Sequence, residues 1–226
     1  MKIFLSISVA ALVVLAGSLP CASADKSDPL WFVFLTKGSV PRPENQDELM
    51  KMQEAHLKNF ERRFAEGKLL SAGPLNDPTR FLRGIVVLQV PDRTEVRRCF
   101  DGDPYVENGI MDLDAFIWGA DPAMINTHLP DPKSIEENRL LMINQVDSSE
   151  LDSAKLAAHR EYALKSYPSR LQGEAKEGPF RRIILFQGTD ETSIRAAMAN
   201  DPLSQAKGVE FKLIPLWLAK GVLEKR

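Results

Sequence analysis

The feature that most constrains the fold of this chain is an internal repeat. Two apolar runs, centred near Ile85 and Ile183, are each followed by an aspartate at +7 and by apolar residues at +11, +14 and +15. An Asp-Pro pair begins at +18 in both places, and in both a glycine precedes a tryptophan by nine residues. The matched residues are Asp92, Val96, Cys99, Phe100 and Asp103 in the first copy and Asp190, Ile194, Ala197, Met198 and Asp201 in the second. So many matches in one order predict a tandem duplication.

Each copy has the pattern strand, helix, strand, strand, helix, strand. In the first copy, short apolar runs predict strands at residues 30–35, 69–72, 84–90 and 111–118. Asn45 with Glu48 three residues later is typical of a helix start, and Gly67 suits the end of that helix. Residues at steps of three and four should form its buried face: Leu49, Met52, His56, Phe60 and Phe64.

A βαββαβ unit of this kind is ferredoxin-like. Its helices cover one face of a four-stranded antiparallel sheet, and the other face must be buried against something else. Two such sheets in one chain can cover each other, so we expect an α+β fold in which two tandem units form an intrachain pseudodimeric barrel. We place the first unit at residues 25–119, a proline-containing linker at 120–138 and the second unit at 139–226. The alternative is two independent domains on a hinge.

The second copy is the more degenerate one. Only five residues separate Pro179 from Ile184, whereas twelve separate Pro74 from Val86. Residues 169–172, Ser-Arg-Leu-Gln, replace the strand residues around Leu69 and Leu70 of the first copy, so this part of the repeat is poorly kept in sequence.

The N-terminus is typical of a secretory signal peptide. Lys2 precedes an uncharged run at residues 3–16, and an Ala-Ser-Ala triplet follows at 22–24. We expect residues 1–24 to be removed and the protein to be exported, either to a periplasm or outside the cell. An uncleaved anchor and a lipoprotein modified at Cys21 are the alternatives. Cys99 is then the only cysteine, so no internal disulfide can form.

Composition excludes some partners. The chain carries 29 basic and 31 acidic residues, a balance that argues against nucleic-acid binding. After cleavage no segment is apolar enough to span a membrane. The three histidines do not have the spacing of metal ligands, so the sequence predicts no metal site. It also has no glycine-rich phosphate loop, so it gives no sign of a nucleotide site, and we expect no cofactor. The expected partner is a small-molecule ligand, and the protein is expected to be a monomer.

Several motifs resemble the YciI (YCII-related) family. They are Ala55-His56-Leu57, the run EGKLLSAGP at residues 66–74, and Asp103-Pro104-Tyr105. The resemblance covers residues 30–119 well and 139–219 in degenerate form. It implies a dimeric α+β barrel whose cleft holds a helix-borne histidine, and some members are small-molecule enzymes, including dehydrochlorinase-type lyases on aromatic substrates. The family is described as having a His-Asp pair, and one position that carries the acid in relatives is Ala65 here.

His56 is therefore the main candidate for general acid–base catalysis, because imidazole takes and gives protons near neutral pH. The competing interpretation is a satisfied histidine on an apolar helix face. Asp103 could orient the ring, or it could serve only the local turn before Pro104. His159 holds the equivalent position in the second copy, where the sequence favours a relic.

Three further residues are candidates for substrate binding. Tyr105 could present a phenolic hydroxyl, while Gly73 and Pro74 could bring backbone amides near a ligand or simply end a strand. Cys99 falls on an apolar helix stripe and is not expected to act as a nucleophile. The sequence thus predicts an exported small-molecule protein with lyase-like acid–base chemistry, or a non-catalytic binding or structural module.

Overall fold

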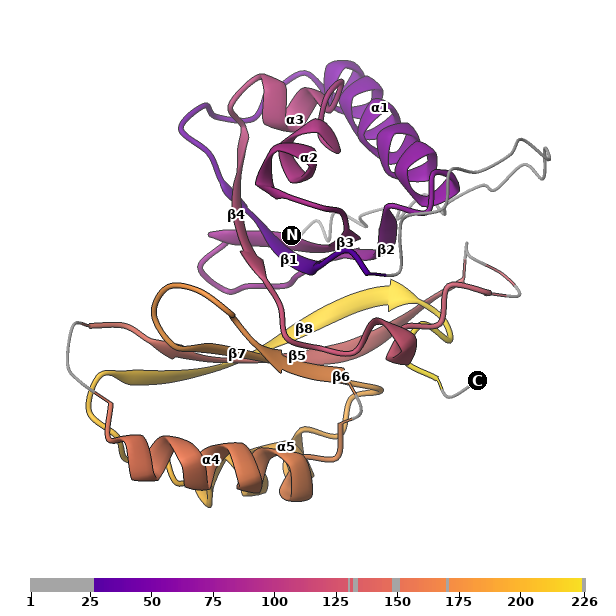
Figure 1. Cartoon of the computed structure of the whole chain (residues 1–226). Coiled ribbons are helices and arrows are strands. Elements are labelled where there is room, and N and C mark those ends of the chain that lie inside the picture. The colour runs from indigo at the N-terminus through magenta and orange to yellow at the C-terminus, as the bar shows by residue number, and fades with distance from the viewer. Residues whose placement is uncertain (1–26, 130, 132–133, 148–150, 170, 225–226) are drawn as a thin grey trace.

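The computed structural model describes residues 27–129, 131, 134–147, 151–169 and 171–224. The expected signal segment, residues 1–24, lies outside the described residues. The rest of the chain forms two units stacked one above the other (Figure 1). Within the residues described, no helix is both long enough and apolar enough to cross a membrane.

The first unit follows the expected order of elements. Its elements are β1 (Leu30–Lys37), α1 (Gln46–Ala65), β2 (Leu69–Pro74), β3 (Leu82–Gln89), α2 (Arg93–Arg98), α3 (Pro104–Glu107) and β4 (Met111–Ile117). The Asn45 side chain accepts hydrogen bonds from the backbone N–H groups of Asp47 and Glu48, at 2.9 and 3.1 Å. These bonds satisfy donors that a helix start leaves free, which is why α1 begins where the sequence predicted.

The second unit repeats this order with one difference from expectation. Its elements are β5 (Ile135–Gln145), α4 (Ser153–Ser166), β6 (Leu171–Glu174), β7 (Arg181–Phe186), α5 (Glu191–Ala199) and β8 (Val209–Ala219), preceded by the short helix η1 (Pro122–Met124). The second strand of the repeat is kept despite its changed sequence, because β6 pairs with β7 from Leu171 to Glu174. β5 begins inside the expected linker, since Ile135 already pairs with Ala219 of the long strand β8. The division of the chain at residues 119 and 138 stays a prediction.

Each unit contains one four-stranded antiparallel sheet. The strand orders are β2-β3-β1-β4 and β6-β7-β5-β8, which are the same order in the two units. Helices α1 to α3 cover the outer face of the first sheet, and α4 and α5 cover the outer face of the second (Figure 1). The inner faces meet, so the expected α+β barrel within one chain is confirmed.

Backbone contacts at both edges close this barrel. On one side Leu75, just after β2, forms a β-bridge with Leu216 of β8. On the other side Trp118, just after β4, forms a β-bridge with Ala175, just after β6. At the second edge the N–H of Gly119 donates to the carbonyl of Glu174 at 2.8 Å. The alternative of two independent domains is therefore wrong.

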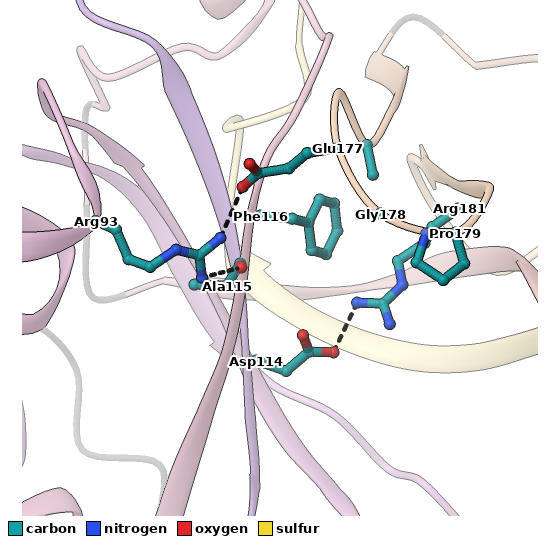
Figure 2. A pocket seen from close by; sticks show the side chains of 9 residues that line it. Arg93, Asp114, Ala115, Phe116, Glu177, Gly178, Pro179 and Arg181 are labelled. Carbon is teal, nitrogen blue, oxygen red and sulfur yellow. Dashed lines mark hydrogen bonds and ion pairs between the residues drawn. The ribbon is translucent and has the colours of Figure 1, made fainter.

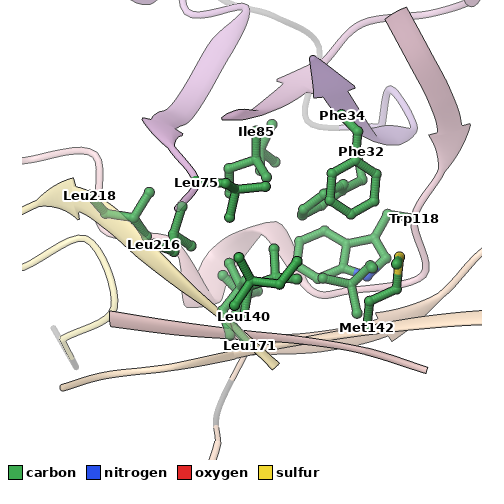
Figure 3. Close-up of a cluster of buried hydrophobic side chains, with 14 of the residues drawn as sticks. Phe32, Phe34, Leu75, Ile85, Trp118, Leu140, Met142, Leu171, Leu216 and Leu218 are labelled. Carbon is green, nitrogen blue, oxygen red and sulfur yellow. The ribbon is translucent and has the colours of Figure 1, made fainter. Parts of the chain in front are cut away.

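The barrel interior is one hydrophobic core shared by the two units. Aromatic rings come from the first sheet, and aliphatic side chains come mainly from the second (Figure 3). Phe32 lies 5.0 Å from Phe34 and 5.1 Å from Trp118, measured between ring centroids. The Trp118 indole N–H donates to the carbonyl of Gly173 in the other unit, at 2.9 Å. Full burial of one large apolar side chain contributes roughly 1.5–3 kcal/mol to stability, so separating the two sheets would cost a large part of the folding free energy.

The glycine in β2 permits the close approach of the two units. A methyl group at Gly73 would lie 1.8 Å from the carbonyl oxygen of Trp217 in β8. At the other edge, a methyl group at Gly119 would lie 2.7 Å from the flexible side chain of Lys176 and 3.2 Å from the Glu174 carbonyl oxygen.

We predict that Gly73→Ala lowers the free energy of unfolding by about 1–3 kcal/mol, because backbone must move to admit the methyl group. Gly119→Ala should cost less, since the Lys176 side chain can swing away. Urea unfolding followed by circular dichroism measures both changes. Equal stability of the wild type and Gly73→Ala would contradict the close approach at this edge.

Candidate functional site

The structure brings His56 and Asp103 into contact. His56 lies on the buried face of α1, and Asp103 is the N-cap residue of α3. Nδ1 of His56 lies 2.6 Å from Oδ2 of Asp103, and the Asp103 side chain is fully buried. A short hydrogen bond to a charged acceptor out of water is stronger than a neutral one. The two residues named from the sequence as an acid–base pair are therefore adjacent.

Asp103 performs both functions that the sequence left as alternatives. While Oδ2 contacts His56, Oδ1 accepts the backbone N–H of Tyr105 at 3.0 Å and caps α3. Turn chemistry and ring orientation do not compete, because a carboxylate has two oxygens. Since a carboxylate only accepts hydrogen bonds, the proton of the pair lies on Nδ1, and the lone pair of the neutral ring lies on Nε2.

Aromatic rings fix the imidazole from two sides. The ring of His56 lies 4.3 Å from that of Phe60 and 5.4 Å from that of Tyr105, edge to face in the second case. The Tyr105 hydroxyl donates to Oε1 of Gln53 on α1 at 3.3 Å, and its expected substrate-binding role stays a prediction. The Tyr105 ring is buried and contacts the guanidinium of Arg42, whose Cζ lies 5.8 Å from the ring centroid.

The second unit contains the same pair, between His159 of α4 and Asp201 beyond α5, and the interpretation of His159 as a relic stays a prediction. Nδ1 of His159 lies 2.9 Å from both carboxylate oxygens of Asp201. Asp201 also accepts the Tyr167 hydroxyl at 2.9 Å and the Leu203 N–H at 2.8 Å. Burial and the Asp201 charge raise the pKa of Tyr167, so its hydroxyl stays protonated as a donor.

The two pairs differ in access to solvent. The His56 side chain is 10% exposed, whereas the His159 side chain is 0% exposed. Nε2 of His159 is buried without a hydrogen-bond partner. The geometry of the pair is therefore shared by the units, and only the first unit leaves its histidine open to a reagent.

A separate cleft of about 290 Å³ lies where β4 meets the loop between β6 and β7 (Figure 2). Two ion pairs cross it from unit to unit: Arg93 to Glu177 at 2.7 Å and Arg181 to Asp114 at 2.6 Å. The guanidinium of Arg181 also lies over the Phe116 ring, 4.9 Å from its centroid. Sequence reasoning missed this cleft, because its residues come from distant segments and share no local motif.

The remaining candidates have structural surroundings. Gly73 packs against the backbone of β8, and the substrate-binding role expected for Gly73 and Pro74 stays a prediction. Burial raises the pKa of the Cys99 thiol to about 11, which disfavours the reactive thiolate. Among the described residues, no group of three or more histidine, cysteine or acidic side chains could hold a metal ion.

Comparison with proteins of curated function gave no match. Solved structures with the same fold include a protein provisionally assigned as a monooxygenase from Fusobacterium nucleatum, with a TM-score of 0.51 and 10% identity over 85% of this chain and 93% of that one. A protein provisionally assigned as a chlorite dismutase has a TM-score of 0.54 and 10% identity over 84% and 95% of the two chains. At such identity the likeness concerns the fold alone.

A third solved structure is a 5-chloro-2-hydroxyhydroquinone dehydrochlorinase from Burkholderia phenoliruptrix AC1100. It is 18% identical over 41% of this chain and 95% of its own, with a TM-score of 0.31. The family model of the YCII-related domain matches residues 32–115, which span the first unit from β1 to β4. Residues 32–115 of this chain are therefore a YCII-related domain.

Proposed function

We propose that this chain is an exported protein that binds a small molecule at its first unit and transfers a proton on it through His56, in a lyase-type reaction. The observation that carries the proposal is the 2.6 Å contact between His56 Nδ1 and the buried carboxylate of Asp103. Export rests on the sequence of residues 1–24.

In this mechanism the two residues have separate tasks. Asp103 holds the proton on Nδ1 and stabilises the imidazolium that forms when the ring accepts a second proton. Nε2 of His56 takes a proton from the substrate and later returns it to the leaving group. Phe60 and Tyr105 hold the ring in one orientation, so that little reorganisation is needed during the transfer.

A second candidate function follows from the other unit. The sealed pair of His159 and Asp201 cannot meet a substrate as it stands, yet it links α4 to the segment after α5. By analogy, the pair of His56 and Asp103 would be a structural link between α1 and α3 in a non-catalytic binding module. The two functions differ in whether His56 is reachable and whether it moves protons.

The three histidines allow a test of access within one protein. We predict that diethyl pyrocarbonate at neutral pH modifies exposed His128 first, His56 more slowly, and His159 only after unfolding. Mass spectrometry of peptides from the folded and urea-unfolded protein measures the three rates. Equal protection of His56 and His159 would remove the access on which the acid–base role depends.

Proton transfer is tested directly by deuterium exchange. The protein is incubated in D₂O with a panel of small carbonyl and phenolic compounds, and incorporation at carbon is followed by NMR. For a compound that exchanges, His56→Gln should slow the reaction by at least about a hundredfold, because the base is lost. His159→Gln, checked for folding by circular dichroism, should retain the rate.

Two outcomes would contradict the catalytic proposal. Exchange that proceeds equally in wild type and His56→Gln would remove His56 from the chemistry. Absence of exchange across the panel, with equal losses of stability in His56→Gln and His159→Gln, would favour the structural link in both units.

A further inference from the structure

Arg42, Arg80 and Arg83 are three arginines of the first unit that have no carboxylate partner among the described residues. Arg42 lies in the loop between β1 and α1, Arg80 lies in the loop between β2 and β3, and Arg83 is the second residue of β3. Across the described ranges none of the three makes an ion pair or a side-chain hydrogen bond. The cleft arginines differ from them, since Arg93 and Arg181 each bind a carboxylate.

The repeat supplies a direct comparison. Arg83 precedes Ile85 by two residues, and Arg181 precedes Ile183 by two, so the repeat aligns them in sequence. Their places in the sheets differ, because Arg181 pairs with Asn144 of β5, whereas Leu82 rather than Arg83 pairs with Thr36 of β1. Arg181 binds Asp114 at 2.6 Å and Asn144 at 3.1 Å, whereas Arg83 has neither kind of partner among the described residues. The aligned arginine is therefore neutralised in the second unit and left positive in the first.

Irregular backbone carries two of these arginines. β1 residues Leu35 and Thr36 pair with Gly84 and Leu82, so Arg83 is the extra residue of a β-bulge. Bulges change the direction of a side chain and are frequent beside functional sites. Arg80 has a φ of +56°, a left-handed conformation that residues other than glycine seldom adopt.

The local charge is unbalanced. Burial, followed by the positive charges of Arg42 and Arg80, lowers the pKa of the Arg83 guanidinium. Asp77 lies near enough to oppose this shift, but its carboxylate is already used. It accepts the Thr79 hydroxyl, the backbone N–H groups of Thr79, Phe81 and Leu82, and the ammonium of Lys212, the last at 2.9 Å. Like charges held together without a counter-ion cost free energy, and an anion would relieve that cost.

This positive cluster adjoins the pair of His56 and Asp103. Arg42 contacts the Tyr105 ring, and the edge of that ring contacts the ring of His56. Between Arg80 and Arg83 stands Phe81, which is 54% exposed, and its carbonyl accepts the Lys37 N–H at 2.7 Å. Cationic groups, an exposed ring and the histidine thus lie on the same side of the first unit.

We propose that Arg42, Arg80 and Arg83 form the anion-binding part of the His56 site, and that they hold the carboxylate or phosphate group of a small organic substrate. This inference rests on the proposed function. Planar guanidinium groups bind both oxyanions through paired hydrogen bonds. Phe81 would cover the apolar part of the same ligand.

The test uses three probes that share a benzene ring. Benzoate, phenyl phosphate and neutral benzamide are titrated separately into ¹⁵N-labelled protein lacking residues 1–24, at constant ionic strength. Two-dimensional NMR follows the arginine Nε–H signals and the backbone signals of Phe81 and Tyr105. We expect saturable shifts at these groups with benzoate or phenyl phosphate and none with benzamide. The stronger of the two anions identifies the preferred oxyanion.

Variants then locate the binding. Arg42→Gln and Arg83→Gln should each raise the dissociation constant of the bound anion by about tenfold or more. Arg181→Gln removes the same charge from the arginine of the second unit that aligns with Arg83 in sequence, and it should leave that constant unchanged. Three results would each overturn the anion site: NMR shifts that do not saturate, shifts of equal size with chloride alone, or an equal rise of the dissociation constant in Arg181→Gln.

Failure of this inference can be told apart from failure of the proposed function. Arginine-dependent anion binding without His56-dependent deuterium exchange would leave the anion site in place and remove the acid–base chemistry. Deuterium exchange that depends on His56 but is unchanged in Arg42→Gln and Arg83→Gln would support the acid–base chemistry and remove the anion site.

Discussion

Each four-stranded sheet of this protein has one face covered by its own helices and one face that only the other unit covers. This requirement determines most of the remaining structure. Burial of the open faces produces a single core, in which aromatic rings of the first sheet meet aliphatic side chains of the second. Close contact of the sheets then demands glycine at Gly73, and it places the edge strands β2 and β8 side by side. Because the interior is occupied by this core, the two His-Asp pairs lie outside the barrel, between each sheet and its helices.

The duplication allows one unit to differ from the other without loss of the barrel. Both units keep a histidine on the first helix and an aspartate beyond the second, at hydrogen-bond distance. In the second unit Asp201 also binds Tyr167, and the imidazole is sealed. In the first, Asp103 binds no tyrosine hydroxyl, and His56 retains a small exposed surface. Stability of the barrel needs both units, whereas chemistry needs access in only one.

The sequence predicted the features that depend on local residue patterns or on the repeat. Asn45 marked a helix start correctly, and the resemblance to the YCII-related family led to His56 and Asp103. Features that depend on register were beyond its reach. The start of β5 inside the expected linker was missed, because it is recognised by the pairing of Ile135 with Ala219. The unpaired state of Arg83 follows from a bulge and from the absence of a partner like Asp114, and neither leaves a local sequence signal.

The sealed pair of the second unit bears on how the exposed pair should be interpreted. Removing one partner of a buried charged pair leaves the other uncompensated, which costs more than removing both. Such a pair can therefore persist for structural reasons after access to it has been lost, and a His-Asp contact alone does not indicate catalysis. What separates the first unit from the second is the combination of an imidazole that is 10% exposed with Arg42, Arg80 and Arg83, which make no ion pair among the described residues. A structural link would need neither, and this asymmetry is the strongest physical reason to seek the ligand beside His56.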